Sequence, residues 1–415
     1  MGTFKKFTSA LVVVFFLAEM LPDNWHDAIH FGGVPLSGIL MAALCLCLFF
    51  VVMVVPRLLD GWVWGGLLAT AAMAIGGYFR GNIDAYTLKF FVADLYCFLS
   101  LVSGYAFGCF LGRDATEALT ARIAVAAGIA IILNYIGLTI GIVHPSFEVP
   151  GRFVSSSIFI AVGALMIFLP WASVSSLYSG KKTMIGPGWL YLTTIATGVM
   201  SATRTILIGS ALIALLYFLL KRHRMGVSFI VRFSTLLLLA IGIFVSGASR
   251  FGDFAFQRLD ETQIQEESRW QELKLWWPQV KDDLVLGQGM GSRFVSNVVV
   301  EGNPLASATH IGIVTFLMKG GVVLFLCCAI FPLVKGVRIM LTPSLPESQR
   351  AAAASVLMFI GLSCLSGGWY QLSLFAYGLA IVSMSPERRK HRVLSEPSSH
   401  SAGWIEHTPM PALQR

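Results

Sequence analysis

Charged residues are scarce in this sequence. Only 13% of its 415 residues are Asp, Glu, Lys or Arg, whereas soluble domains carry about 25%. Hydrophobic residues make up 56%, and the mean hydropathy is +0.74. So few charges cannot cover the surface of a water-soluble fold. The composition therefore excludes a soluble globular protein and predicts an all-α polytopic membrane protein.

Disulfide and metal motifs are also missing. None of the cysteines lies in a long loop, so we predict neither a disulfide nor a metal cluster; they sit in apolar runs at Cys45, Cys47, Cys97, Cys109, Cys327, Cys328 and Cys364. The acidic residues of the one long loop contain no Asp-x-Asp pair, so we interpret them as a solvated face rather than as metal ligands. They are Asp253, Asp260, Glu261, Glu266, Glu267, Asp282 and Asp283.

Long apolar runs are what the sequence has instead. A helix crosses a bilayer with about 20 apolar residues. The runs predict about 12 transmembrane helices, nine within 1–247 and three within 309–385. The first run resembles a signal peptide but has no small-x-small cleavage site, so we interpret it as a span. The approximate spans are 7–22, 34–56, 61–79, 86–112, 119–143, 153–177, 186–203, 204–220, 227–247, 309–334, 351–367 and 371–385.

The net charge of +8 favours orientation in a membrane over nucleic-acid binding, because the basic residues fall in short loops on one side of the spans. That side holds Lys5, Lys6, Arg57, Arg113, Arg122, Lys181, Lys182, Lys221, Arg222, Arg224, Lys335, Arg338, Arg350, Arg388, Arg389, Lys390 and Arg392. The other side holds little more than Arg80, Arg152 and Arg204. Positive residues mark the cytoplasm, so we predict that both termini are cytoplasmic.

One connection, 248–308, is far longer than the others and is predicted to be periplasmic. Trp270, Leu273, Trp276 or Trp277, and Val280 recur in it at helical spacing, which predicts a short amphipathic helix lying on the membrane surface. Pro278 should kink or end this helix. The tail 386–415 is polar and rich in Pro and Ser, and is predicted to be a disordered cytoplasmic segment.

The stretch DLVLGQGMGSRF, 283–294, follows this helix and carries Gly287, Gly289 and Gly291. A nucleotide-binding fingerprint would need a βαβ unit, for which there is no room. Two interpretations stay open. The stretch is either a glycine-rich connector or a nest of backbone N–H groups for a lipid-linked phosphate, with Arg293 as an additional phosphate contact.

Polar residues gather at the predicted periplasmic ends of the spans. They are Arg152, Arg204, Arg269 and His310. Each alone would be an ordinary membrane-interface residue, but all four fall at one depth. Inside the spans, Lys319 and Asp94 are costly in lipid. Lys319 could line a cavity for a lipid carrier or pair with Asp94 for structural reasons.

The residues around this level resemble a known family. Arg269-Trp270, Trp277-Pro278, Gly287 and Gly289, His310 and Gly321 follow in an order similar to the core of the O-antigen ligase and polymerase superfamily. The segment GRFVSSSIFIAVGAL, 151–165, and the twelve-span layout are similar as well. This sequence departs from the pattern at Ile311, where the family usually has a polar residue, and in the serine-rich run after Arg152.

The resemblance implies a metal-independent, inverting glycosyltransferase of the GT-C type in the bacterial inner membrane, without a cofactor. It would use an undecaprenyl-diphosphate-linked glycan as donor on the periplasmic face, with His310 as base and with Arg204 and Arg269 on the diphosphate. The acceptor would be lipid A–core in an O-antigen ligase. An O-antigen or exopolysaccharide polymerase, which extends the glycan on its carrier, is the alternative.

The chemistry of the residues agrees with this implication. A neutral His can remove the proton of a sugar hydroxyl, nearby Arg charge keeps the imidazole neutral, and Arg absorbs the charge of a departing diphosphate. A transporter or flippase would be expected to show repeated halves with paired broken spans, and a channel would need a filter-like motif. The sequence has neither of these features.

Overall fold

A computed structural model describes residues 2–21, 30–31, 34–54, 56, 59–83, 88–143, 154–174, 187–201, 204–221, 262–300, 303–306, 309, 311–365 and 371–385. Three predicted segments lie outside the described residues: the span 227–247, residues 248–261 of the long loop, and the tail 386–415. The predicted disorder of that tail is therefore not addressed by the structure.

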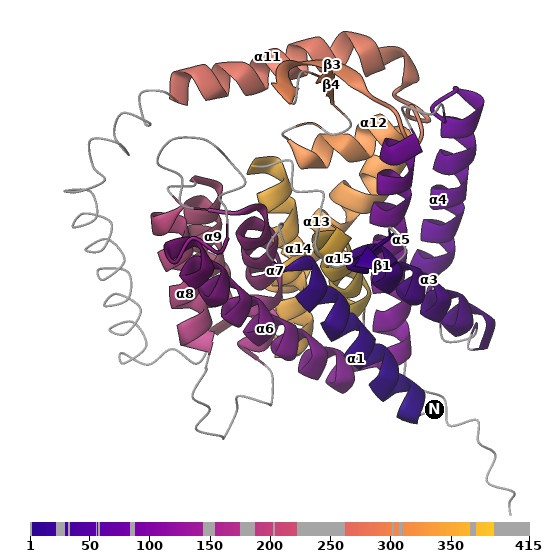
Figure 1. The fold of residues 1–415 in the computed structure, drawn as a ribbon. Helices are drawn as coiled ribbons and strands as arrows, with labels where there is room; N and C mark the ends of the chain where they lie inside the picture. The colour runs from indigo at the N-terminus through magenta and orange to yellow at the C-terminus, as the bar shows by residue number, and fades with distance from the viewer. Residues whose placement is uncertain are drawn as a thin grey trace, which may run out of the picture. The chain divides into compact units, whose positions relative to one another are not determined.

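The described part is mostly helical, as predicted (Figure 1). Its α-helices before the long loop are α1 (Gly2–Glu19), α3 (Leu36–Val54), α4 (Gly61–Phe79), α5 (Leu88–Leu111), α6 (Arg113–Thr139), α7 (Ser156–Ala172), α8 (Pro187–Met200) and α9 (Arg204–Lys221). The remainder are α11 (Thr262–Val280), the 3₁₀ turn η3 (Lys281–Asp283), α12 (Gly312–Phe325), the π-helical turn η4 (Leu326–Ile330), α13 (Phe331–Leu341), α14 (Glu347–Leu365) and α15 (Gln371–Ser383).

Five of the described helical segments are long and apolar enough to cross a membrane. They are Gly61–Phe79, Leu88–Leu111, Asp114–Thr139, Gly312–Leu341 and Glu347–Leu365. Four shorter apolar helices lie at Gly38–Val54, Ser157–Ala172, Ile208–Tyr217 and Gln371–Ser383. The chain is therefore a membrane protein, while the predicted count of about 12 spans and the side of each loop stay predictions.

The predicted all-α class fits most of the described residues, which also form two short β-hairpins that were not predicted. β1 (His30–Phe31) pairs antiparallel with β2 (Val34–Pro35), and β3 (Phe294–Val300) pairs antiparallel with β4 (Asn303–Ala306). The second hairpin forms because β3, FVSNVVV, is rich in β-branched residues that favour an extended backbone.

Close helix crossings hold the membrane part together. α5 packs against α3, α4 and α15, while α14 packs against α7, α9, α13 and α15. Where α5 crosses α15, a Cβ added at Gly104 would lie 2.2 Å from the carbonyl oxygen of Phe375, and one added at Gly378 would lie 2.3 Å from that of Leu101. Glycine at both positions lets the two backbones touch, as is typical of helix pairs in membranes.

Two basic side chains on the predicted cytoplasmic side cap neighbouring helices. Lys5 Nζ donates to the carbonyl oxygen of Leu111, at the end of α5, at 3.2 Å. Arg350 donates to the carbonyl oxygen of Leu219, near the end of α9. Since the last carbonyls of a helix have no partner within it, these cations stabilise helix ends.

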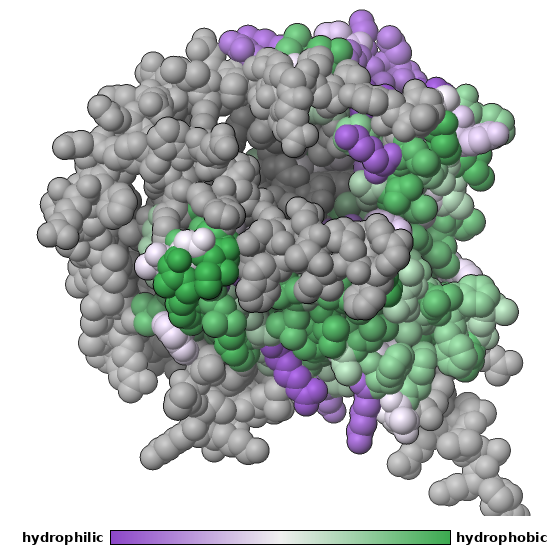
Figure 2. Space-filling view, viewed as in Figure 1, coloured by the Kyte–Doolittle hydropathy of each residue, from purple (hydrophilic) through white to green (hydrophobic). Residues whose placement is uncertain are grey.

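The surface has the polarity expected of a bilayer protein. Large apolar side chains are exposed on α3 and α4, and Leu68 has 72% of its surface accessible. In the coloured part of Figure 2, hydrophobic side chains cover the helices, and hydrophilic side chains gather above and below them. Such a broad apolar exterior is stable only in contact with lipid.

Candidate functional site

The structure describes only part of the predicted site. His310 and Arg152 lie outside the described residues. Arg204 begins α9 and Arg269 lies within α11, but their side chains are also outside the description. The roles assigned to these four residues therefore stay predictions. The described members of the predicted site are Gly287, Gly289, Gly291, Arg293 and Lys319.

Residues 284–293, here called the glycine loop, pass between membrane helices in close contact. Gly287, Gly289 and Gly291 have φ values of +73°, +79° and +76°. A Cβ at Gly287 would lie 2.5 Å from the backbone nitrogen of Gly321, and one at Gly289 would lie 2.3 Å from that of Gly77. Both the left-handed backbone and the contacts therefore require glycine at these two positions.

The backbone amides of the glycine loop are already engaged by the protein. Five consecutive N–H groups donate to protein oxygens: Gly287 to Asp283 O (2.7 Å), Gln288 to Met318 O (2.7 Å), Gly289 to Lys319 O (3.0 Å), Met290 to Met73 O (3.0 Å) and Gly291 to Asp94 Oδ2 (2.8 Å). A nest for a phosphate needs N–H groups that point at the ligand. The structure thus favours the connector interpretation of the three glycines.

The glycine loop completes the hydrogen bonding of a broken helix. α12 is interrupted at Gly321, whose φ of +67° and ψ of −168° are not helical. The carbonyls of Met318 and Lys319 accept from the loop instead of from the next helical turn, and the N–H of Val322 donates to the carbonyl oxygen of Leu284 at 2.7 Å. Irregular backbone at membrane depth is tolerated where protein satisfies it in this way.

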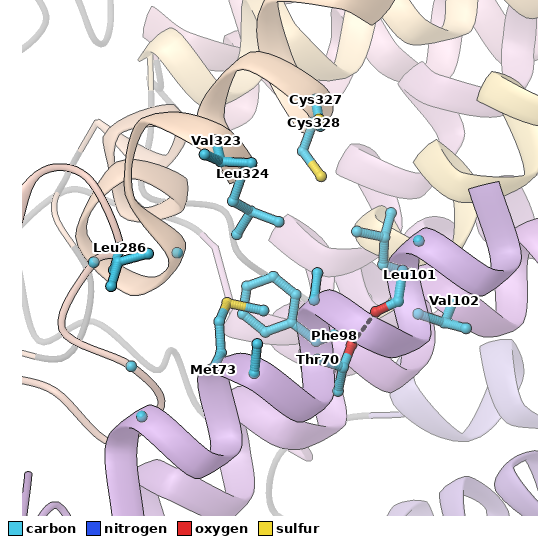
Figure 3. A pocket seen from close by; sticks show the side chains of 18 of the residues that line it. Thr70, Met73, Phe98, Leu101, Val102, Leu286, Val323, Leu324, Cys327 and Cys328 are labelled. Carbon is cyan, nitrogen blue, oxygen red and sulfur yellow. Dashed lines mark hydrogen bonds between the residues drawn. The ribbon is translucent and has the colours of Figure 1, made fainter. Parts of the chain in front are cut away.

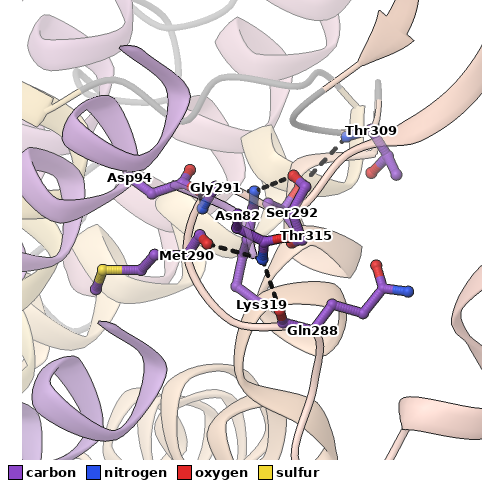
Figure 4. Close-up of polar contacts among 9 residues, drawn as sticks. All are labelled: Asn82, Asp94, Gln288, Met290, Gly291, Ser292, Thr309, Thr315 and Lys319. Carbon is purple, nitrogen blue, oxygen red and sulfur yellow. Dashed lines mark hydrogen bonds and ion pairs between the residues drawn. The ribbon is translucent and has the colours of Figure 1, made fainter. Parts of the chain in front are cut away.

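A buried ion pair fixes the glycine loop to two helices (Figure 4). Lys319 Nζ on α12 lies 2.7 Å from Asp94 Oδ2 on α5 and donates to the carbonyl oxygen of Ser292 at 2.7 Å. The same Asp94 oxygen accepts from the N–H of Gly291. Lys319 has no solvent-accessible surface. The hypothesis that Lys319 pairs with Asp94 is thereby confirmed.

The other side of the glycine loop is held by the end of α4. Arg80 Nη1 forms a 2.8 Å ion pair with Asp283 Oδ1. Asn82 Nδ2 donates to the carbonyl oxygens of Gln288 at 3.1 Å and Met290 at 3.0 Å (Figure 4). The sequence alone did not predict these contacts of Arg80 and Asn82, because the residues around position 80 give no sign of a partner about 200 positions further along the chain.

Arg293 follows the glycine loop and is partly buried. Its guanidinium carbon lies 5.3 Å from the ring centroid of Phe90, a distance typical of a cation–π contact. A contact of this residue with phosphate stays a prediction.

The amphipathic helix is present, but the partner of its apolar face differs from the expectation. α11 covers the predicted segment, includes Pro278 and ends at Val280. Trp276 and Val280 are buried in a cluster with Phe294 of β3 and Met318 of α12. The prediction that this face lies on the membrane surface is therefore wrong for Trp276 and Val280, because the hairpin and α12 offer protein contacts that the helical pattern alone did not reveal.

This cluster makes α11, the β3–β4 hairpin and α12 one packed unit. The backbone that re-enters the membrane part is also held, since Thr309 is buried and its hydroxyl donates to the carbonyl oxygen of Ile311 at 2.6 Å. The N–H of Thr309 donates to Thr315 Oγ1 at 3.4 Å. The two neighbours of residue 310 in sequence are thus fixed to the start of α12.

These features define a membrane protein in which the helix α11, a hairpin and a broken membrane helix are packed together beside a glycine loop. Residues 189–329, from α8 to η4, match the family model described as O-antigen ligase. The match supports membership of the O-antigen ligase superfamily and hence supports an enzyme that resembles glycosyltransferases. It contains Arg204, Arg269 and His310, whereas Arg152 lies outside it. No curated protein and no solved structure matches the chain.

Proposed function

We propose that this protein transfers a glycan from undecaprenyl diphosphate to a sugar hydroxyl on the periplasmic face of the bacterial inner membrane. The proposed acceptor is lipid A–core, which makes the protein an O-antigen ligase. The proposed reaction needs no metal and inverts the anomeric carbon. The match of residues 189–329 to the ligase family carries this proposal, since it spans the positions of the proposed base and of both proposed diphosphate ligands.

The packing of the described residues supports a common scaffold for two of these three positions. α11 carries Arg269, and the chain enters α12 directly after residues 309–311. Trp276 and Met318 belong to one buried cluster, which links these two helices. A donor diphosphate bound at Arg269 and a base at His310 would therefore be held by one rigid unit, as a preorganised site requires.

In the proposed reaction, His310 accepts the proton of the acceptor hydroxyl while that oxygen attacks the anomeric carbon of the donor. General-base catalysis of this kind contributes roughly 10²–10⁴-fold. The bond to the diphosphate breaks at the same carbon, and Arg204 and Arg269 stabilise the charge that develops on the leaving oxygen. The planar, permanently charged guanidinium suits phosphate oxygens better than the point charge of lysine does.

The test is transfer by the purified protein in liposomes without an ion gradient, with an undecaprenyl-diphosphate-linked glycan and lipid A–core. We expect glycan-capped lipid A–core from the wild type and none from His310→Ala. Arg204→Lys and Arg269→Lys should keep the fold and lose roughly tenfold or more of the rate. Arg338→Lys, at an exposed cation on the predicted cytoplasmic side, is the matched control and should retain most of the rate.

The alternatives give different products in the same assay. A polymerase would lengthen the glycan on its carrier and leave the lipid A–core bare. A transporter or flippase would form no new glycosidic bond with or without a gradient, and this outcome would refute the proposal.

A further inference from the structure

A long groove lies beside α4, and two residues of the glycine loop, Gly287 and Gly289, are part of its lining. Its volume is about 690 Å³, within the range of roughly 300–1,000 Å³ that is usual for ligand pockets. α4 forms one wall, α5 the second, and α12 with η4 the third (Figure 3). The lining runs from Asp60 to Arg80, the whole length of α4. At about 1.5 Å per residue this is close to the thickness of a hydrocarbon core.

Two irregularities shape the groove. On the α4 wall the lining includes Gly61, Gly65, Ala69 and Gly76, which follow one helix face and leave space where side chains would otherwise project. Opposite them, the π-helical turn Leu326–Ile330 places Cys327 and Cys328 in the wall. Single π-helical turns of this kind are frequent at functional sites.

The middle of the groove has few polar groups that could form hydrogen bonds with water. The hydroxyl of Thr70 donates to the carbonyl oxygen of Gly66 at 2.7 Å and is thus already satisfied. Other side chains of the wall are apolar, such as Met73, Phe98 and Leu101 (Figure 3). Apolar cavities of this kind do not fill with water. An empty one forfeits the dispersion contacts of its lining.

The two charged residues of the lining, Asp60 and Arg80, lie at opposite ends of the groove. At the second end, Arg80 and Asp283 form a pair whose side chains are 40% and 29% exposed. Beside them the tip of the glycine loop exposes Val285 and Leu286, the latter at 77%. A half-exposed cation next to a half-exposed anion complements a headgroup that itself carries both charges.

We propose that this groove binds one acyl chain of a zwitterionic phospholipid. The phosphate of the headgroup lies against Arg80, and its ammonium group lies against Asp283. The bilayer supplies the chain, because the exposed outer side of α4 is apolar and in contact with lipid. The bound acyl chain fills the space between α4 and the core. The C-terminal end of α4 is held separately, by the contacts of Arg80 and Asn82 with residues 283–290. This inference does not depend on the proposed reaction.

The test uses the full-length purified protein in detergent, stripped of lipid and then titrated with phosphatidylethanolamine, phosphatidylglycerol or undecaprenyl phosphate. Native mass spectrometry counts the bound lipid, and the thermal unfolding midpoint reports its effect. We expect one phosphatidylethanolamine per chain that survives detergent exchange and raises the midpoint. Equal or stronger retention of phosphatidylglycerol or undecaprenyl phosphate would overturn the proposal.

Gly65→Leu is the decisive variant, because a Cβ at Gly65 meets no atom within 4 Å and a leucine there projects into the groove. We expect roughly tenfold weaker phosphatidylethanolamine binding, since the leucine displaces several buried methylenes. Gly65→Ala, which gains the same helix propensity with little volume, and Ala71→Leu, on the exposed side of α4, should bind like the wild type. Unchanged binding by Gly65→Leu in a folded protein would refute the groove as the site.

Arg80→Gln and Asp283→Asn test the headgroup contact separately from the chain contact. Each should reduce the preference for phosphatidylethanolamine over phosphatidylglycerol while leaving the acyl chain able to enter the groove. An unchanged preference in both variants would contradict the proposed headgroup position.

Discussion

Breaking the Asp94–Lys319 pair should destabilise the fold more than removing both charges. In Lys319→Met the Asp94 carboxylate stays buried, and among the described residues it keeps a hydrogen bond from the N–H of Gly291, while the carbonyl oxygen of Ser292 loses the Lys319 donor. Removing one member of a buried pair costs about 3–5 kcal/mol. Asp94→Leu, which strands the ammonium group, should cost a similar amount.

The double variant Asp94→Leu/Lys319→Met leaves no buried charge. The N–H of Gly291 and the carbonyl oxygen of Ser292 lose their side-chain partners, at a cost of about 1–3 kcal/mol for each group, but replacing a whole buried ion pair by apolar side chains is itself often neutral or stabilising. Additive single effects would instead sum to about 6–10 kcal/mol. We therefore predict that the double variant is more stable than either single variant.

The assay is the unfolding midpoint followed by tryptophan fluorescence in one fixed detergent, with the monodisperse fraction on gel filtration as a second readout. The expected order of stability is wild type, then the double variant, then both single variants. A Lys319→Met protein as stable as the wild type would refute a stabilising role of this ion pair. So would a double variant whose loss of stability equals the sum of the losses in the two single variants.

Three further predictions concern the same region. Gly287→Ala should lower the free energy of unfolding by well over about 1 kcal/mol, because a Cβ there would lie 2.5 Å from backbone atoms. Gly81 has the same φ of +73° but no atom within 4 Å of an added Cβ, so Gly81→Ala should cost only the roughly 1 kcal/mol of the left-handed backbone. Comparing the thermal unfolding of the two variants therefore separates the cost of the steric contact from the cost of the backbone conformation. Trp276→Ala should lose about 3–5 kcal/mol, and the half-exposed Trp277→Ala much less, in the same measurement; equal losses would contradict the packing of α11. Asn82→Ala removes two hydrogen bonds to the glycine loop, worth about 1 kcal/mol each. The variant should therefore be cleaved faster in the glycine loop by limited proteolysis. Unaltered cleavage would show that the Asn82 hydrogen bonds do not hold the loop.

The sequence predicted a mostly helical membrane protein and the approximate bounds of several described helices, because a bilayer imposes a simple rule of length and polarity. The predicted span 61–79 coincides with α4, and the predicted break between the seventh and eighth spans falls between α8 and α9. The partner of Lys319 was also within reach, since a cation in lipid needs an anion and Asp94 was available. The free-energy cost of an unpaired charge in lipid was enough to indicate Asp94 as a partner for Lys319.

Contacts between distant segments were not predictable in the same way. The glycine loop was recognised from its spacing, but not the interruption of α12 that it completes, because Gly321 gives no local sign that residues 284–289 pair with it. The periodicity of α11 showed an apolar face without showing what covers it. Periodicity reports that a face is buried, and the tertiary partner decides whether lipid or protein buries it.

The most direct test of the central claim is a lipopolysaccharide gel from a bacterial strain that lacks this gene and is complemented with the wild type or with His310→Ala at matched expression. The ligase assignment predicts a full ladder with the wild type, and bare core with glycan accumulating on undecaprenyl diphosphate in the variant. Core capped by a single repeat would indicate a polymerase instead. A normal ladder in both the uncomplemented strain and the His310→Ala strain would contradict any role of this protein in that transfer.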